Sequence, residues 1–338
     1  MNEWRRWREA VADWVRLREW RHGGGIDPAA DAVARKLLGH GPDIAQWRWF
    51  LDRLALSLGV ALCAAGVICF IAANWEHIGK FPRVFGIQAL LVGVVAVAAR
   101  LGLARSGGQA ALWLAMVLLG GLLALIGQIY QTGADTWELF SLWAVLALPW
   151  AFAGRHAAIW LLWIAVANIA LGLWADTFSH PLRGDGRNWS LVGLFDVALS
   201  LGWSLAAMRW VEFEGRVGPR LLAAAALLCT SLPAIEAASA GYGPRFGFEL
   251  CAWLIAVVVL AVIALLRSRD RAVLAMTAVS AIGVSTVWLF QLASKYLFKQ
   301  DDEPAALWLL LAVIVVSEAT AAALWLRRLD RQAAEADA

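Results

Sequence analysis

Six polar side chains lie inside or at the ends of long apolar segments, where each must find a protein partner or water. They are Asn74, Gln128, Tyr130, Asp196, Glu236 and Glu318. A carboxylate in the middle of a bilayer costs roughly 2.5–3.5 kcal/mol on insertion scales, so the three acids should face protein or water rather than lipid. Carboxylates and amides grouped there suit a cation, an amine or a proton relay. We therefore treat the first five residues as candidate ligand-binding groups and Glu318 as a candidate proton relay.

A second interpretation is that these polar groups are helix-end residues at the lipid headgroups, each paired locally. We favour this interpretation for Glu138, Glu249 and Gln291, which lie at the ends of apolar segments. For the acids that lie deeper in the segments, Asp196, Glu236 and Glu318, we consider the two interpretations about equally well supported. Asp196 lies about 9 Å below the outer end of its segment at 1.5 Å per residue, whereas Glu318 lies toward the cytoplasmic side.

Ten apolar segments carry these residues, and most are long enough to cross about 30 Å of hydrocarbon. They cover residues 54–74, 84–104, 110–130, 137–153, 157–175, 190–210, 220–239, 248–266, 272–293 and 305–326. Of the 338 residues, 61% are hydrophobic and 16% are charged, whereas a soluble domain has about 25% charged residues. The segments are apolar all round, which is typical of helices in a membrane. The sequence therefore predicts an all-α polytopic transmembrane helix bundle with about ten spans.

The basic residues predict how the bundle is oriented. Most of the 29 lysines and arginines lie before the first segment, after the last one or in every second loop between them. Because cytoplasmic loops carry an excess of Lys and Arg, we expect both termini to be cytoplasmic and the acid-rich loops to face outward. The expected location is a bacterial inner membrane, with the lipid bilayer as the main partner. The net charge of +3 is small and unevenly distributed, so we expect no nucleic-acid partner.

Residues 1–50 are expected to form a separate cytoplasmic helical hairpin, followed by the bundle at 51–328 and a short cytoplasmic tail at 329–338. Trp4, Trp7 and Trp14 recur at helical spacing, and Asp27 with Pro28 can begin a second helix. This Trp- and Arg-rich hairpin either packs on its own second helix or on a protein partner at residues 1–45, or lies on the membrane surface.

Two polar stretches follow the first and third apolar segments. The first contains Ala72–Trp75, AANW, and the second contains Gly127–Tyr130, GQIY, followed by a short polar turn and Trp137. Together with the opening stretch Leu17–Ala30, LREWRHGGGIDPAA, they resemble a bacterial membrane family catalogued as domain of unknown function 2157. The resemblance covers about residues 17–153. It implies a membrane protein whose activity is not established, and it supplies no catalytic residues.

The sequence contains no motif that points to catalysis, a cofactor or a metal. It has no HExxH, no GxSxG and no glycine-rich phosphate loop, and its five histidines lie outside the apolar segments. We therefore expect no cofactor and no metal ion, and we favour a non-enzymatic protein, although catalytic residues spread over several helices would escape such a search.

The leading hypothesis is binding or transport of a small polar or cationic molecule through an outward-facing polar pocket. The alternative is a structural or regulatory membrane scaffold that docks a protein partner through its N-terminal cytoplasmic helices. Discontinuous helices are typical of transporters, and only the segments that contain Pro149 and Pro233 could be interrupted in this way.

Overall fold

The computed structural model describes residues 44–73, 79–130, 133–178, 186–239, 247–268, 270–296 and 304–336. Contacts divide the chain into two compact units, Met1–Ala73 and Asn74–Ala338. The described part of the first unit is one long helix, α3 (Ile44–Ala73). The predicted N-terminal hairpin falls almost wholly outside the described residues, and so does Asn74 of the candidate site.

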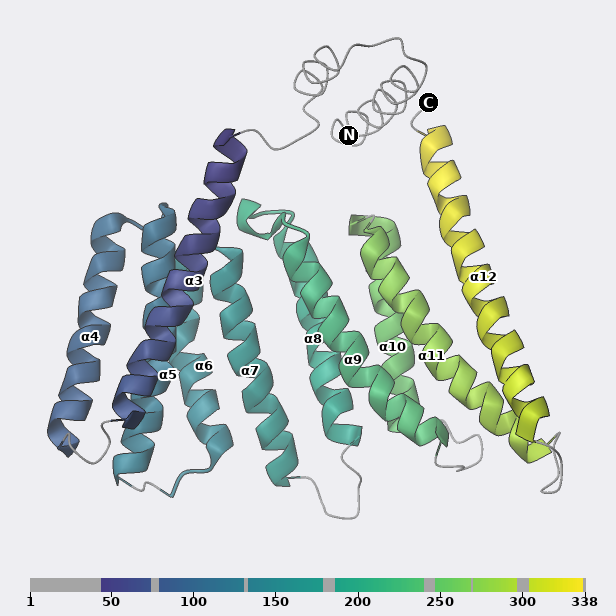
Figure 1. Cartoon of the computed structure of the whole chain (residues 1–338), viewed down its shortest axis with the longest axis horizontal. Coiled ribbons are helices and arrows are strands. Elements are labelled where there is room, and N and C mark those ends of the chain that lie inside the picture. The colour runs from purple at the N-terminus through teal and green to yellow at the C-terminus, as the bar shows by residue number, and fades with distance from the viewer. Residues whose placement is uncertain are drawn as a thin grey trace, which may run out of the picture. The chain divides into compact units, whose positions relative to one another are not determined.

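The second unit is a series of helices that run alternately up and down (Figure 1). Their bounds are α4 (Lys80–Leu101), α5 (Ser106–Tyr130), α6 (Thr136–Gly154), α7 (Ala157–Phe178), α8 (Gly186–Ala206), α9 (Val217–Ser239), α10 (Phe248–Ile263), α11 (Arg271–Tyr296) and α12 (Pro304–Ala336). Together with α3, each helix covers one apolar segment predicted from the sequence, and most ends agree within a few residues. The described residues contain no strand, so the all-α polytopic class is confirmed.

Length and composition decide which of these helices can cross a membrane. Eight of them, α4 to α11, are long and apolar enough, whereas α3 and α12 contain shorter apolar stretches, Leu54–Val67 and Leu309–Trp325. In lipid every backbone N–H and C=O group must be bonded within the segment, so apolar stretches of this length fold as helices. Eight of the ten expected spans are thus supported, and the first and the tenth stay predictions.

The two spans that contain proline are continuous helices. α6 runs unbroken through Pro149, and α9 runs unbroken through Pro233. The possibility of an interrupted helix at either proline is therefore excluded by the structure. The irregular turn lies elsewhere, because α10 ends in a π-helical turn, Ala264–Ser268. That turn contains neither proline nor glycine, so nothing in the sequence indicated it.

The helices of the second unit pack as two groups of neighbours, α4 to α7 and α8 to α11. α4 pairs with α5, and α6 pairs with α7. In the other group α9 packs on α8, α10 and α11, and its buried face includes Ala223, Ala226 and Leu227. α7 and α8 join the two groups through a smaller contact, and α12 packs on α11.

Glycines allow two pairs of neighbouring helices to approach closely. A Cβ atom added to Gly120 in α5 would lie 2.5 Å from the ring of Trp143 in α6. One added to Gly218 in α9 would lie 2.3 Å from the ring of Trp203 in α8. At both contacts the tryptophan ring occupies the space that a side chain would need.

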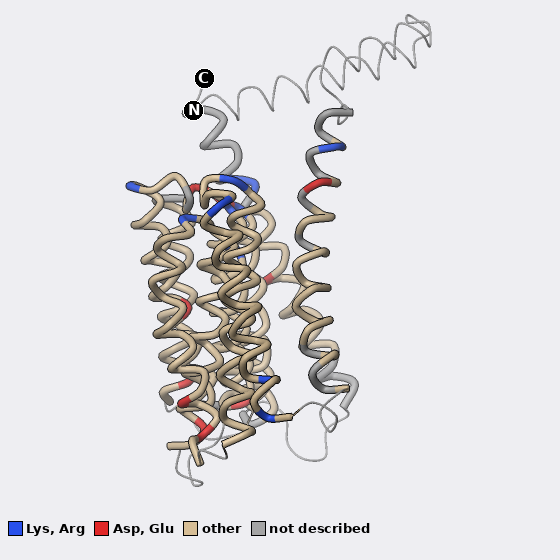
Figure 2. Tube along the Cα trace, turned by 90° about the vertical axis from the view of Figure 1, so that its left-hand side faces the viewer, with Lys and Arg blue, Asp and Glu red and all other residues tan. Residues whose placement is uncertain are grey.

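Arginines are more numerous at one end of the second unit and carboxylates at the other, although both signs of charge occur at both ends (Figure 2). The end that holds the α4–α5, α6–α7 and α8–α9 loops carries Arg100, Arg105, Arg155, Arg209 and Arg216. The opposite end carries Asp135, Glu138, Asp176, Glu236 and Glu249. We call these the Arg-rich end and the acidic end. Which end faces the cytoplasm stays a prediction from the positive-inside rule.

Candidate functional site

Asp196 of α8 is the most deeply buried carboxyl group among the described residues of the spans. Its side chain is 1% exposed, and its Oδ1 accepts a hydrogen bond of 2.8 Å from Nδ2 of Asn168 in α7. No basic side chain bonds to Asp196 in the described part of the chain. The amide oxygen of Asn168 is also buried, and no described residue donates to it. The two side chains form a carboxyl–amide pair in which the buried amide oxygen has no donor among the described residues.

Helix α9 also packs on α8 near this pair. The two helices lie close together at Gly193, one turn before Asp196, where an added Cβ would lie 2.5 Å from Thr230 and 3.0 Å from the carbonyl oxygen of Ala226. Thr230 is buried, and its hydroxyl donates to the Ala226 carbonyl at 2.8 Å. The hydroxyl hydrogen is thus used within α9 and is not offered to Asp196.

The other candidate ligand-binding residues lie away from Asp196. Gln128 and Tyr130 are exposed in the last turn of α5, where Tyr130 is 60% exposed. Glu236 is exposed near the end of α9, at the acidic end. No hydrogen bond or ion pair within the described residues joins any two of these four side chains. The structure brings Asp196 together with Asn168, and a pocket shared with the other residues stays a prediction.

Glu318 of α12 has two hydroxyl partners on α11. Oε1 lies 2.8 Å from Oγ of Ser285, and Oε2 lies 2.9 Å from Oγ1 of Thr286. The carboxyl group is half-buried, and the contact lies where α12 packs on α11. The candidate proton relay is therefore part of a helix–helix contact.

A third polar cluster joins α9, α10 and α11. The hydroxyl oxygens of Ser231 and Ser280 are 2.7 Å apart, and Nε1 of Trp253 donates to Oγ of Ser280 at 2.9 Å. Hydrogen bonds between spans contribute about 0.6 kcal/mol on average. This uncharged cluster ties three helices together and needs no ligand to satisfy its polar atoms.

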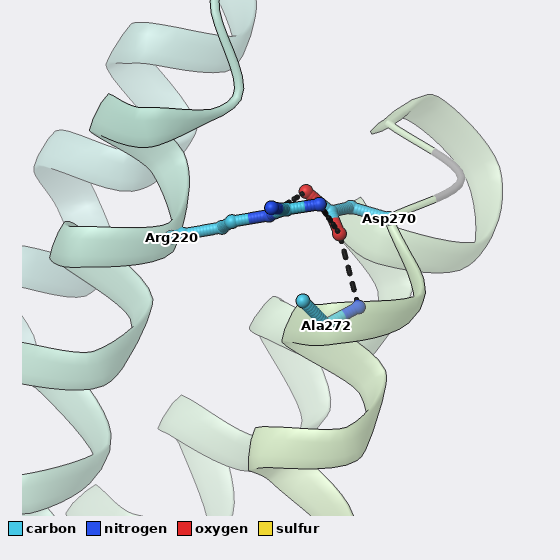
Figure 3. A network of polar contacts seen from close by, with 3 residues as sticks. All are labelled: Arg220, Asp270 and Ala272. Carbon is cyan, nitrogen blue, oxygen red and sulfur yellow. Dashed lines mark hydrogen bonds and ion pairs between the residues drawn. The ribbon is translucent and has the colours of Figure 1, made fainter. Parts of the chain in front are cut away.

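An ion pair connects α9 to the start of α11 at the Arg-rich end (Figure 3). Nε and Nη2 of Arg220 donate to the two carboxylate oxygens of Asp270 at 2.8 and 3.0 Å, and the N–H of Ala272 donates to the same carboxylate at 3.0 Å. Burial alone would raise the pKa of Asp270. The hydrogen bonds from Arg220 and Ala272, with the positive charges of Arg220 and Arg216, outweigh burial and hold this pKa below its ordinary value.

Two of the three residues for which we favoured the second interpretation, Glu138 and Gln291, have a hydrogen-bond partner within the described residues. Glu138 accepts a hydrogen bond of 3.2 Å from the backbone N–H of Asp135 and so caps its own helix. Gln291 donates through Nε2 to the carbonyl oxygen of Ser239 at 3.2 Å. These contacts stabilise helix ends and leave the buried carboxyl groups as the stronger candidates for function.

The pairing of Asn168 with Asp196 was missed by sequence reasoning, although a signal for it exists. Asn168 lies ten residues before the end of α7, and Asp196 lies ten residues after the start of α8. Two antiparallel helices that share a loop bring such positions to the same depth. The same rule brings Ser285 and Thr286 of α11 near the depth of Glu318 in α12, but whether their side chains meet depends on how the two helices are rotated.

The fold and these clusters define a polytopic α-helical membrane protein with carboxyl groups inside its bundle. A family of predicted membrane proteins, DUF2157, matches residues 18–160 of this chain. The match includes the AANW and GQIY motifs and confirms the resemblance that they suggested. Asp196 and Glu318 lie outside the matched residues. No curated protein and no solved structure matches the chain.

Proposed function

We propose that this membrane protein binds a proton or another small cation inside its helix bundle and moves it across the membrane. The observation that carries the proposal is the Asp196 carboxyl, 1% exposed within an apolar span, with an amide and no basic side chain as its described partner. An ionised carboxylate in such surroundings costs several kcal/mol unless another charge compensates it. A bound proton or cation removes that cost.

The amide of Asn168 supports the proposal because it can serve both states of the site. Its Nδ2 donates to the Asp196 carboxylate, and its buried Oδ1 has no donor among the described residues. A proton on Asp196, or a cation held beside it, would give that oxygen its missing partner. An amide has both donor and acceptor capacity, so the same side chain can hold the carboxyl group before and after loading.

The remaining candidates would act as an approach to this site. Gln128, Tyr130 and Glu236 lie at or near the acidic end, which the sequence predicts to face outward, and Asn74 is expected there too. A surface of one sign of charge raises the local concentration of the opposite ion. In this proposal the protein sits in the inner membrane of a bacterium and draws cations to its outer side.

The test is ion flux into sealed liposomes that contain the purified full-length chain. The probes are protons, sodium, potassium and methylammonium, each driven by an imposed gradient and read with an interior dye or a radiolabel. We expect the wild-type protein to exceed empty liposomes for at least one probe, and the Asp196→Asn variant to fall to the level of empty liposomes for that probe. The Asp196→Glu variant, which keeps the carboxyl group, should retain part of the flux.

The matched control is Glu138→Gln, which removes one negative charge from a helix cap and should leave the flux unchanged, because glutamine also serves at that capping position. Equal flux in wild type and Asp196→Asn, or wild-type flux no greater than that of empty liposomes for all four probes, would contradict the proposal.

A further inference from the structure

The ion pair between Arg220 and Asp270 fixes the position of one arginine side chain at the Arg-rich end (Figure 3). Asp270 is 2% exposed, and its two carboxylate oxygens accept hydrogen bonds from Nε and Nη2 of Arg220. Nη1 of Arg220 has no acceptor among the described residues, and the side chain is 40% exposed. A guanidinium group carries N–H donors on all three nitrogens. Both N–H groups of Nη1 are therefore left for a further acceptor.

Arg216 lies one helical turn before Arg220 and has a positive charge that nothing nearby neutralises. Its carbonyl oxygen accepts from the N–H of Arg220 at 3.2 Å, and residues four apart are neighbours on a helix surface. Its charge also helps to lower the pKa of Asp270, so the two groups are near each other. Arg216 is exposed, and no described residue forms a hydrogen bond or an ion pair with its side chain. Since Arg220 already compensates Asp270, the charge of Arg216 remains available.

The two loops that this ion pair connects are basic overall. Residues 209–220 and 264–271 contain six arginines and three acids, Glu212, Glu214 and Asp270. Their charges therefore sum to an excess of positive charge. Such an excess attracts an anion and repels a cation.

An exposed apolar stripe runs along α9 from these arginines into the span. Its side chains are 53–66% exposed, and they are Val217, Leu221, Leu228 and Leu232. Their spacing of four, seven and four residues places them on one face of the helix. The stripe is about 22 Å long at 1.5 Å per residue, which exceeds half of a hydrocarbon core of about 30 Å. A lipid whose acyl chains cover this stripe has its headgroup at the level of Arg216 and Arg220.

We propose that Arg216 and Arg220 bind the phosphate of an anionic phospholipid, whose acyl chains lie along the exposed stripe of α9. Nη1 of Arg220 and the guanidinium group of Arg216 donate to the phosphate oxygens, and Asp270 holds Arg220 in place. Basic sites between transmembrane helices are known to bind anionic headgroups. A zwitterionic headgroup fits less well, because its ammonium group would meet the same excess of positive charge.

The apolar stripe distinguishes a phospholipid from a soluble phosphate. A soluble anion contacts the arginines alone, whereas a phospholipid also covers the leucines that follow them along α9. The inference concerns the Arg-rich end of α9 and α11, and it does not depend on the function proposed for Asp196.

The test is lipid binding to the full-length chain in a neutral detergent, measured by native mass spectrometry. The probes are dioleoyl phosphatidylglycerol and dioleoyl phosphatidylcholine, which have the same acyl chains. We expect the wild-type protein to bind phosphatidylglycerol more tightly. Because each arginine near a lipid surface contributes about 1 kcal/mol, Arg216→Gln should weaken phosphatidylglycerol binding about fivefold. Its binding of phosphatidylcholine should not change. Arg216→Lys keeps the charge and should retain most of the affinity.

Arg105→Gln is the matched control. It removes one exposed arginine from the α4–α5 loop at the same end of the second unit, and phosphatidylglycerol binding should equal that of wild type. Arg216 bonds to no described side chain, so its replacement should leave the fold intact. Equal binding of the two lipids by wild type, or equal loss of binding in Arg105→Gln and Arg216→Gln, would overturn the proposal. Displacement of phosphatidylglycerol by an equal concentration of glycerol phosphate would overturn it in favour of a soluble anion.

Discussion

At the scale of single residues, Gly120 and its neighbour Gly121 allow the closeness of α5 and α6 to be tested. A Cβ at Gly120 would lie 2.5 Å from the Trp143 ring, whereas a Cβ at Gly121 would meet nothing within 4 Å. The ring cannot move away freely, because Nε1 of Trp143 donates to the carbonyl oxygen of Met116 at 2.9 Å. We expect Gly120→Ala to lower the free energy of unfolding by about 1–3 kcal/mol through overpacking.

The matched variant Gly121→Ala should be neutral or more stable by about 0.5–1 kcal/mol, because alanine has less backbone freedom than glycine to lose when the chain folds into a helix. Unfolding in mixed micelles with increasing denaturing detergent measures both. Replacing Trp143 by leucine in the Gly120→Ala background should recover part of the loss. Equal stabilities of the two alanine variants would show that the ring does not limit the approach of the helices.

At the scale of helices, the ion pair between Arg220 and Asp270 gives a stability that depends on pH. The pKa of Asp270 is held below its ordinary value in the folded protein, whereas an unfolded aspartate has a pKa of about 3.9. Between these two values the unfolded chain binds a proton that the folded chain does not. Acidification through this range therefore lowers the free energy of unfolding, and the contribution is complete above the unfolded pKa.

We expect Asp270→Asn to lack this dependence. The Arg220 side chain is 40% exposed, so solvent screening limits the contribution of the pair to about 1 kcal/mol. The stability difference between wild type and Asp270→Asn should be greatest at neutral pH and should vanish as the pH falls through the folded pKa of Asp270. Unfolding curves at a series of pH values measure it, and parallel curves for the two proteins would contradict the assignment.

The helices themselves could be predicted because bilayer thickness and backbone hydrogen bonding impose long apolar segments, and these are visible in the sequence. The side-chain pairs could not be predicted in the same way. Whether Asp196 meets Asn168, or Glu318 meets Ser285, depends on helix rotation and on which helices are neighbours. An all-round apolar helix has no polar face from which its rotation can be deduced.

At the scale of the whole molecule, the separation of charge along the second unit connects the sequence prediction to the proposed function. Most of the arginines lie at one end and most of the carboxylates at the other (Figure 2), although Arg83 and Arg187 lie at the acidic end and Glu214 and Asp270 at the Arg-rich end. If the acidic end faces outward, its carboxylates would attract cations from outside toward Asp196. If it faces the cytoplasm, cations that leave Asp196 on their way into the cell would pass the same carboxylates. The direction of any flux therefore depends on which end faces the cytoplasm.

Labelling of single cysteines in whole cells tests this orientation. After replacement of the four native cysteines, Ala134→Cys places a thiol in the exposed α5–α6 loop at the acidic end, and Gly215→Cys places one in the exposed α8–α9 loop at the Arg-rich end. Both positions are exposed, and a Cβ at Gly215 meets nothing within 4 Å. Because the positive-inside rule puts the Arg-rich end in the cytoplasm, a membrane-impermeant maleimide should label position 134 in intact cells and position 215 only after permeabilisation. Labelling in the reverse order would show that the acidic end faces the cytoplasm. Cations drawn by the acidic end would then enter the proposed site from the cell interior.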